Sequence, residues 1–288
     1  MHFNILTIFP NILDSYINES ILKRARERNF IMIDFHDIRD YATGKHAHVD
    51  DTPYGGGPGM IFKVEPIFRC LEKVAGREAV AQRIMRKELI DGNKKSAGEA
   101  VPLGAHKEPR IILMSPQGAQ LTQQKTEELA KHEKLILVCG RYEGVDARVR
   151  YLIDEEISIG PYVLSGGELP AMVVVETVAR LVPGVLGSAD SLALESYSDP
   201  LRNSSNLSLR GAKRRSNLLS NLTKNKFRNI SYMFSDKKND PLCASRRHIE
   251  YPQYTRPEIF EPIPGVQLRV PEILLSGDHK KIGEWRSE

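Results

Sequence analysis

Residues 158–172 read SIGPYVLSGGELPAM, and this stretch decides how the rest of the chain is interpreted. Its short apolar run ends at Ser165, and two glycines follow, Gly166 and Gly167. A carboxylate, Glu168, and a series of helix formers come next, an order typical of a strand, a tight turn and a helix. Adjacent glycines leave bare backbone where side chains would otherwise stand. The stretch therefore predicts a loop at a strand end that something approaches closely.

Strand-like and helix-like patterns alternate upstream of this stretch. Apolar runs typical of buried strands occupy residues 3–9, 30–35, 110–115 and 134–140. Apolar residues at helical spacing occupy residues 10–29, 62–74 and 123–132. Such alternation indicates an α/β domain with a largely parallel sheet that is covered on both faces. In this class, ligands bind at the carboxyl ends of the strands.

Two stretches interrupt the alternation. Residues 76–109 are charged, contain glycine and lack a clear period, so we expect a loop insertion there. Residues 201–249 are rich in Ser, Asn, Lys and Arg, a composition typical of solvated or disordered segments. They carry twelve Lys or Arg and two Asp, whereas the formal net charge of the whole chain is only +4. The rest of the chain is therefore net negative, and the overall charge does not indicate a basic catalytic part.

Composition indicates a soluble globular protein. The chain has 288 residues, of which 41% are hydrophobic and 27% are charged, enough for one large domain or two small ones. No apolar run is long enough to span a membrane, and the start lacks the pattern of a signal peptide. The three cysteines are far apart and form no CxxC pair. This argues against a disulfide framework and favours a reducing cytoplasm.

The first glycine-rich segment, DDTPYGGGPGM at residues 50–60, matches no nucleotide-binding motif. No GK[ST] follows it, and the third glycine of GxGxxG is absent. We interpret it as a functional lid, because long glycine-rich loops in compact domains are usually functional or disordered. His46 and His48 precede Asp50 and Asp51, but their spacing defines no metal geometry, so we predict no metal site held by protein ligands.

Three later loops are stronger candidates for a ligand site. They are MSPQG at residues 114–118, CGRYEGVD at 139–146, and the stretch at 158–170. Each follows an apolar run and offers glycine backbone beside polar atoms, which suits a flat, neutral adenine. The nearby acids would repel a polyphosphate but tolerate a cationic ligand; they are Asp154, Glu155 and Glu156. The loops therefore favour S-adenosylmethionine over ATP.

These loops also carry a resemblance to a known family. The motifs that carry it occur in order along the chain: YGGGPGM, SPQG, LILVCGRYEGVDARV, IDEEISIGPYVLSGGELPAM, PGVLG, YPQYTRPE and VPEILLSGDHKKIGEWR. Together they resemble the TrmD family, the bacterial tRNA (guanine-N1)-methyltransferases of the SPOUT class. The resemblance covers residues 1–74, 110–199 and 250–285.

The resemblance implies a fold that composition could not show. Residues 1–184 would form a knotted, cofactor-binding α/β domain whose parallel sheet ends in a deep C-terminal trefoil knot. Residues 185–249 would be a linker with a basic, low-complexity insertion. Residues 250–288 would be a small helical tRNA-binding domain, and it looks truncated because the family usually continues beyond GEWRSE.

In the family, the knot loops hold S-adenosylmethionine in a bent shape. Carried over by motif, the resemblance implies a set of cofactor-binding residues: Leu113, Met114, Ser115, Pro116, Gly140, Tyr142, Glu143, Ile159, Gly160, Pro161, Tyr162, Val163, Leu164, Gly166, Gly167 and Pro170. Related sequences often have Asp at the position of Pro161. Because proline lacks a backbone donor, we expect the N–H groups of Gly160 and Tyr162 to bind the cofactor instead.

The reaction that the resemblance implies needs a base and a cation. Guanine N1 carries a proton, which a carboxylate can accept while a cation near O6 stabilises the developing charge. The family base is an Asp, and the matching run here, ESYSD, places Glu195 at that position. Arg180 matches the family arginine that orients the guanine and its O6. The resemblance also implies Mg2+, for which no ligand residue can be named.

The leading hypothesis is a homodimeric, cytoplasmic enzyme that methylates N1 of guanosine 37 in tRNA, next to the anticodon. Two alternatives remain open: an RNA- or cofactor-binding relic without catalysis, and a knotted methyltransferase with another RNA target. They arise from the short C-terminus and from the insertion at residues 200–249, which begins close to Glu195. A flexible insertion costs little closure entropy, about 0.6 kcal/mol per doubling of loop length.

Overall fold

The computed structural model describes residues 1–44, 46–92, 108–186 and 250–287. The strands within these ranges are β1 (His2–Thr7), β2 (Met32–Asp37), β3 (Asp50–Asp51), β4 (Ile61–Phe62), β5 (Arg110–Gln120), β6 (Lys134–Cys139), β7 (Glu155–Ser158), β8 (Ile259–Ile263) and β9 (Val266–Arg269). The α-helices are α1 (Asp14–Ile17), α2 (Ser20–Glu27), α3 (Val64–Ala75), α4 (Arg77–Gly92), α5 (Gln123–Leu129), α6 (Glu168–Ala179), α11 (Glu272–Leu275) and α12 (His279–Ser287). Two 3-10 helices are η1 (Ile38–Tyr41) and η2 (Ala147–Tyr151).

The centre of the fold is a five-stranded sheet in the order β2-β1-β6-β5-β7. All four pairings in it are parallel, as the alternation of strand and helix patterns predicts. The parallel α/β architecture is therefore confirmed. The strands share one carboxyl edge, and the opposite side is the amino edge of the sheet. The trefoil knot that the resemblance implies stays a prediction.

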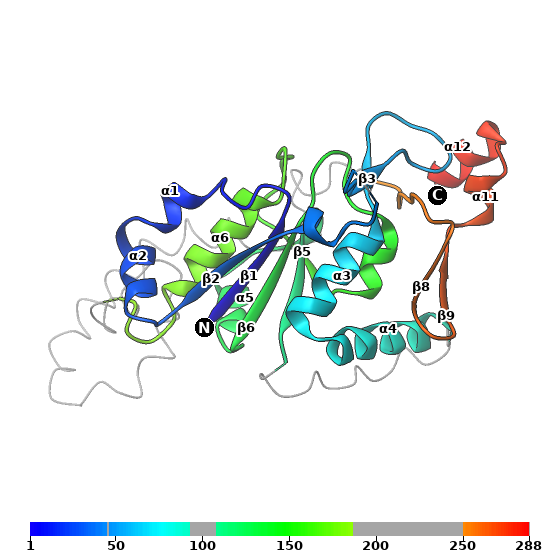
Figure 1. The fold of residues 1–288 in the computed structure, drawn as a ribbon. Coiled ribbons are helices and arrows are strands. Elements are labelled where there is room, and N and C mark those ends of the chain that lie inside the picture. The colour runs from blue at the N-terminus through cyan, green and yellow to red at the C-terminus, as the bar shows by residue number, and fades with distance from the viewer. Residues whose placement is uncertain (45, 93–107, 187–249, 288) are drawn as a thin grey trace, which may run out of the picture. The chain divides into compact units, whose positions relative to one another are not determined.

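Both faces of the central strands are buried, because β1, β6 and the first half of β5 carry apolar residues on both sides. In β5, Ile111 and Leu113 pack with α3 and α4, whereas Ile112 and Met114 pack on the other face with α6. Successive strand residues point to opposite faces, so a strand covered on both sides has no polar alternation. Figure 1 shows α3 and α4 on one side of the sheet and α1, α2, α5 and α6 on the other.

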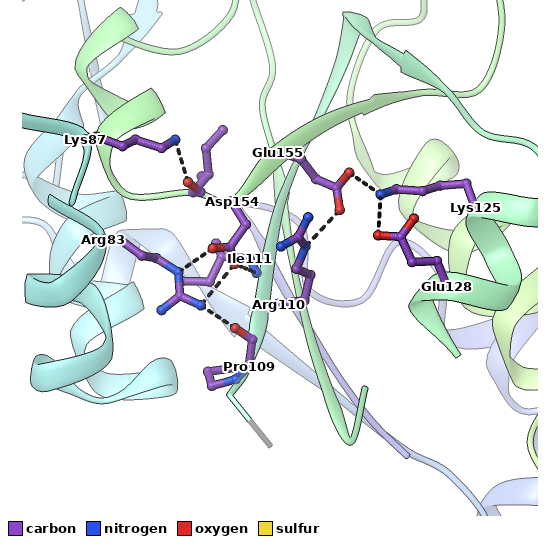
Figure 2. Close-up of polar contacts among 10 residues, drawn as sticks. Arg83, Lys87, Pro109, Arg110, Ile111, Lys125, Glu128, Asp154 and Glu155 are labelled. Atoms are coloured by element: carbon purple, nitrogen blue, oxygen red, sulfur yellow. Dashed lines mark hydrogen bonds and ion pairs between the residues drawn. The ribbon is translucent and has the colours of Figure 1, made fainter. Parts of the chain in front are cut away.

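The loop insertion expected at residues 76–109 is wrong for its first half, because α4 is a helix. Its inward side carries Val80 and Ile84, which are fully buried, but also Arg83, which is only 4% exposed. A charged residue in the middle of the buried face hides the apolar period from a sequence scan. Figure 2 shows Arg83 reaching from α4 to Asp154, at the start of β7. Residues 93–107 lie outside the described ranges.

Residues 251–287 belong to the same compact unit as the described residues of the first three ranges. The C-terminal part begins with a β8–β9 hairpin, whereas the sequence predicted only helix there. Two prolines, Pro262 and Pro264, hide the strand pattern. Phe260 of β8 packs edge-on against Phe68 of α3, with ring centroids 5.4 Å apart. This part therefore shares the core of the main unit. No helix in the described ranges is long and apolar enough to cross a membrane.

Candidate ligand site at the carboxyl edge

The three predicted loops lie together at the carboxyl edge of the sheet. Residues 115–118 bulge out of β5, residues 140–145 follow β6, and residues 159–167 follow β7. Strands β6, β5 and β7 are neighbours in the sheet, so their carboxyl ends are adjacent. We call these segments the carboxyl-edge loops. Their position agrees with the general place of ligand sites in parallel α/β folds.

The first carboxyl-edge loop is a bulge in the pairing of β5 with β7. The register with β7 shifts between Met114 and Ala119, so the residues between them leave the ladder. Leu113 and Met114 are buried in the strand, whereas Ser115 is partly exposed and Pro116 is exposed. Only the latter two reach the surface of the site, and the first two support it from below.

The second carboxyl-edge loop turns sharply at Tyr142, whose φ of 61° lies in the left-handed region. Its ring is 56% exposed and packs edge-on against Phe62 at 5.6 Å. The Glu143 N–H donates to the carbonyl of Met60 at 3.2 Å, which joins this loop to the end of the glycine-rich segment. A Cβ added at Gly140 would meet only a Val145 methyl, at 3.1 Å. The Cβ position of Gly140 is therefore less tightly enclosed than those of Gly166 and Gly167.

The third carboxyl-edge loop is held by bonds within itself. The Ser158 hydroxyl accepts from the Gly160 N–H at 3.2 Å, and the Tyr162 N–H donates to the Gly160 carbonyl at 2.9 Å. Both N–H groups that we expected to bind the cofactor beside Pro161 thus already have acceptors, and the geometry does not support that expectation. A Cβ on Gly160 would lie only 2.3 Å from the Tyr162 ring, so the ring fills the space beside this glycine.

Apolar side chains at the tip of this third loop face solvent. The exposed fractions are 52% for Tyr162, 79% for Val163 and 39% for Leu164. Ile159, at the start of the loop, packs against the core on the α6 face. Exposed apolar groups beside bare glycine backbone suit a ligand that presents a flat apolar surface.

The two adjacent glycines make room for other parts of the protein. A Cβ on Gly167 would lie 2.8 Å from Cα of Cys139, and the Gly167 N–H donates to the Gly140 carbonyl at 2.9 Å. A Cβ on Gly166 would lie 2.6 Å from Nε of Arg141. Both glycines therefore let the third loop close against the second. Pro170, in the first turn of α6, needs no helical N–H bond there.

The electrostatic argument for a cationic ligand is wrong for Asp154 and Glu155. They lie just before and at the start of β7, at the amino edge, whereas the backbone of Glu156 lies against Gly118 of the first loop. Asp154 pairs with Arg83 at 2.9 Å, and Glu155 pairs with Arg110 at 2.9 Å (Figure 2). Asp154 and Glu155 are close to the third loop in sequence, but strand β7 separates their side chains from it in space.

The glycine-rich segment contacts the C-terminal part of the chain. Four of its glycines have positive φ: Gly55, Gly56, Gly57 and Gly59. Nη2 of Arg286, on α12, donates to the Gly56 carbonyl at 2.6 Å. Its role as a lid stays a prediction. Beside it, Asp51 pairs with Arg256 at 2.9 Å. No three His, Cys, Asp or Glu side chains gather for a metal within the described part of the chain.

Of the two predicted catalytic residues, only Arg180 is described, and it does not lie with the loops of its own chain. Arg180 follows the last residue of α6, whose first residue adjoins the third loop. A helix of that length spans about 18 Å. Just beyond Arg180, a Cβ on Gly184 would lie 2.8 Å from the ring of Phe30, which precedes β2. This end of α6 therefore lies at the amino edge. Glu195 is outside the described residues.

Sequence reasoning missed two buried ion pairs that shape the site. Arg141 contacts Glu168 through Nε at 3.1 Å, and Glu168 is only 2% exposed. Asp146 pairs with Arg148 at 2.8 Å and accepts from the Thr255 N–H at 2.8 Å, so it joins the second loop to the C-terminal part. The sequence did show that these charged residues stand inside glycine-rich motifs, which is a sign of a structural or functional role. Their ion-pair partners could not be predicted from local spacing.

Comparison with known proteins places the chain in a family. A family model described as tRNA (Guanine-1)-methyltransferase TrmD matches residues 1–90, 82–216 and 234–288. A tRNA (guanine-N(1)-)-methyltransferase of Geobacter sulfurreducens is 39% identical over 100% of this chain and 85% of its own length. One of Moorella thermoacetica is 39% identical over 100% of this chain and 84% of its own length.

A solved structure agrees with the sequence comparisons. It is the crystal structure of tRNA (m1G37) methyltransferase from Aquifex aeolicus, which is 29% identical, with a TM-score of 0.51. The similarity covers 99% of this chain and 87% of that one. Parallel strands, glycine-bearing loops and full-length similarity agree: the chain belongs to the TrmD family of tRNA (guanine-1)-methyltransferases.

Proposed function

We propose that this protein transfers a methyl group from S-adenosylmethionine to N1 of guanosine 37 in tRNA. The observation that carries the proposal is the full-length similarity to enzymes named for this reaction, one of them for position 37. The carboxyl-edge loops support it, because they bring the implied cofactor-binding residues of three strands to one edge. This similarity favours an active enzyme over a binding relic.

The residues at this edge fit the cofactor. Gly140 presents backbone without a side chain at the end of β6, and Tyr142, Tyr162 and Val163 of the second and third loops offer exposed apolar or aromatic surface. We propose that the adenosine part lies against Gly140 and that the third loop covers it. When bound, S-adenosylmethionine supplies an electrophilic methyl group on its sulfonium. The loops would orient it and exclude water, and holding reactants in line contributes much of the rate in such reactions.

The chain must also remove the proton from guanine N1. We propose that the Glu195 carboxylate accepts it and that the Arg180 guanidinium stabilises the charge at O6. The resemblance implies Mg2+ as well. The described residues form no acidic cluster to hold it, so we assign it no step.

We further propose that the enzyme works as a homodimer in which a second copy supplies Arg180. Arg180 lies the length of α6 away from the loops of its own chain, too far for a side chain to span. Apolar side chains are exposed around α1 and the start of α6: Phe9, Ile12, Tyr16 and Leu169. The two elements are close together, since the Glu176 carboxylate raises the pKa of Tyr16. This surface suits contact with another copy.

We assign cofactor binding to residues 1–184 and tRNA binding to residues 250–288 together with the basic linker. The contact between Asp146 and Thr255 supports a link between the two functions, because it joins a carboxyl-edge loop to the C-terminal part. We propose that the reaction occurs in the cytoplasm, where its tRNA substrate is processed. Cys70 and Cys139 are free, buried thiols, in keeping with that compartment.

Methyl transfer to defined tRNA transcripts tests the proposed function. Labelled S-adenosylmethionine is mixed with transcripts that carry guanosine or adenosine at position 37, or guanosine at a neighbouring position. We expect label only with guanosine 37. Label at another guanosine would indicate a different RNA target, and binding of tRNA and cofactor without transfer would indicate a relic.

The base assignment has its own test. Glu195→Gln keeps the size of the side chain but cannot accept a proton, so the single-turnover rate should fall about 10²–10⁴-fold. Glu195→Asp, with the usual family residue, should keep most of the rate. Asp199→Asn and Glu250→Gln are the matched controls. Loss of rate in a control, with a normal rate in Glu195→Gln, would move the assignment to that control residue.

A further inference from the structure

A buried carboxylate connects three segments at the carboxyl edge. Glu168 is the first residue of α6 and is 2% exposed. Its Oε1 accepts from the hydroxyl of Thr7, the last residue of β1, at 2.7 Å. Nε of Arg141, in the second carboxyl-edge loop, donates to both carboxylate oxygens at 3.2 and 3.1 Å. One side chain thus joins β1, the loop after β6 and the start of α6.

The surroundings fix the geometry of this group. The guanidinium of Arg141 lies over the ring of Phe9, 4.6 Å from its centroid, and the Arg141 side chain is only 19% exposed. The Thr7 hydroxyl also accepts from the Phe9 N–H at 3.0 Å. The Glu168 carboxylate at the amino end of α6 is further favoured by the helix dipole. The ion pair is therefore fixed by the Phe9 ring on the Arg141 side and by the Thr7 hydroxyl on the Glu168 side.

Gly166 of the third loop lies directly against the ion pair between Arg141 and Glu168. A Cβ on Gly166 would stand 2.5 Å from Oε2 of Glu168 and 2.6 Å from Nε of Arg141. Arg141 also forms an isolated antiparallel bridge with Gly166. The absence of a side chain at Gly166 thus allows the ion pair to form beneath the loop. The ion pair in turn fixes the distance between the second and third loops.

We propose that Glu168 is a positioning residue for the cofactor site, acting through Arg141 and Thr7. By holding the third loop against the second, it sets the spacing of the two loops between which we place the cofactor. It touches neither the reacting methyl nor the guanine. The proposal rests on the proposed function, because it assigns the space beside Gly140 to the cofactor.

Calorimetry with S-adenosylhomocysteine, the reaction product, tests the positioning role apart from catalysis. Glu168→Gln keeps the volume of the side chain but removes the charge that Arg141 contacts. We expect a folded protein whose affinity for S-adenosylhomocysteine falls about 10- to 100-fold, as for a lost charged hydrogen bond. The KM for the cofactor should rise, while kcat at saturating cofactor should stay within about threefold, because no reacting group has been removed.

Asp154→Asn is the matched control, because it breaks a buried ion pair at the amino edge. It should lower stability and leave the affinity for S-adenosylhomocysteine unchanged. A purely structural role for Glu168 would give the same result in Glu168→Gln, and that outcome would overturn the proposal. If Glu168→Gln does not fold, Thr7→Val, which removes one hydrogen bond, should still weaken binding severalfold. Normal affinity in a folded Thr7→Val protein would then overturn the proposal.

The two proposals fail in different ways. Wild-type protein that binds S-adenosylhomocysteine but does not methylate tRNA would refute the function, and weakened binding in Glu168→Gln would still support the positioning role. Wild-type protein that methylates tRNA, with unchanged binding in Glu168→Gln, would refute the positioning role alone.

Discussion

The two edges of the central sheet are built by different means. At the amino edge, charged side chains pair in a buried network: Arg83 with Asp154 at 2.9 Å, and Glu155 with both Arg110 at 2.9 Å and Lys125 at 2.6 Å (Figure 2). At the carboxyl edge, glycine backbone and exposed apolar side chains form the surface. The ion pair between Arg141 and Glu168 lies beneath it.

The two edges serve different purposes: the amino edge stabilises the fold, and the carboxyl edge is suited to ligand binding. The amino edge satisfies its charges within the chain, and Asp154 also accepts from the backbone N–H of Ile111 at 2.7 Å. That edge therefore has little left to offer a ligand. At the carboxyl edge, Val163 is 79% exposed and Tyr142 is 56% exposed. Apolar side chains that stay exposed contribute less to the stability of the fold than buried ones. Such a local loss of stability is typical of functional sites.

The largest effect on stability is expected at the amino edge. Asp154→Asn leaves the Arg83 guanidinium, on a side chain that is 5% exposed, without its charged partner. Removing one member of a buried pair typically costs about 3–5 kcal/mol. Urea unfolding of the variant should show this loss in the free energy of unfolding. The affinity for S-adenosylhomocysteine should not change.

Glu155→Gln provides a graded comparison at the same edge. Its pair with Arg110 is more exposed, with side-chain exposures of 16% and 10%, so the loss should be smaller, about 1–3 kcal/mol. A larger loss in Glu155→Gln than in Asp154→Asn would contradict the role assigned to Arg83. Weaker cofactor binding in Asp154→Asn would show that the two edges are not independent.

The next effect compares two glycines within the carboxyl edge. In Gly167→Ala, the new Cβ would lie 2.8 Å from the backbone Cα of Cys139, which cannot move easily. Forcing a methyl group into such a contact typically costs about 1–3 kcal/mol. In Gly140→Ala, the Cβ would meet only a Val145 methyl, at 3.1 Å, which can shift. The loss of stability should be clearly smaller for Gly140→Ala in urea unfolding.

Cofactor binding should respond differently at Gly140. Gly140→Val places a branched side chain at the position that we assign to the adenosine, so calorimetry should show that binding of S-adenosylmethionine is lost while the protein stays folded. Unchanged affinity in a folded Gly140→Val protein would remove this position from the site. Equal losses of stability in Gly167→Ala and Gly140→Ala would contradict the division between a packing glycine and a ligand glycine.

The sequence predicted the sheet and the location of the loops well, for a physical reason. The buried segments of β1, β5 and β6 lie between helices, so the runs at residues 3–9, 110–115 and 134–140 are mostly apolar and stand out in the sequence. Glycines at strand ends then indicated the carboxyl edge. Helix α4 was missed because Arg83 occupies its buried face, and the β8–β9 hairpin was missed because its strands contain or adjoin prolines.

The contacts that hold the site together could not be predicted from spacing. Arg141 and Glu168 are 27 positions apart, and Thr7 and Glu168 are 161 apart. Their pairing depends on the order of strands in the sheet, which local patterns do not contain. The opposite error affected Asp154 and Glu155, which were assigned to the site because they precede a site loop in sequence. Residues that are close in sequence were wrongly expected to be close in the folded protein.

The smallest effect concerns a titratable group that stays neutral, in contrast to the paired charges of the amino edge. His36 of β2 is partly buried, and its Nε2 lies 2.9 Å from Oδ1 of Asn4. Burial lowers the pKa of His36 from its ordinary value of 6.5; nearby Asp34 opposes this shift, and Lys134 and His2 add to it. The folded state therefore resists protonation where the unfolded chain accepts it.

The direction of the pH effect on stability follows from this difference in pKa between the folded and unfolded states. The contribution of His36 is present above about pH 6.5, the ordinary histidine pKa, and is lost as the pH falls through that value toward the lower folded-state pKa. His36→Gln keeps a donor toward Asn4 but cannot titrate. The fall in the urea midpoint between pH 7 and pH 5 should be slightly smaller in the variant than in the wild type. An identical fall in both proteins would show that His36 titrates alike in both states, and that burial at β2 does not keep it neutral.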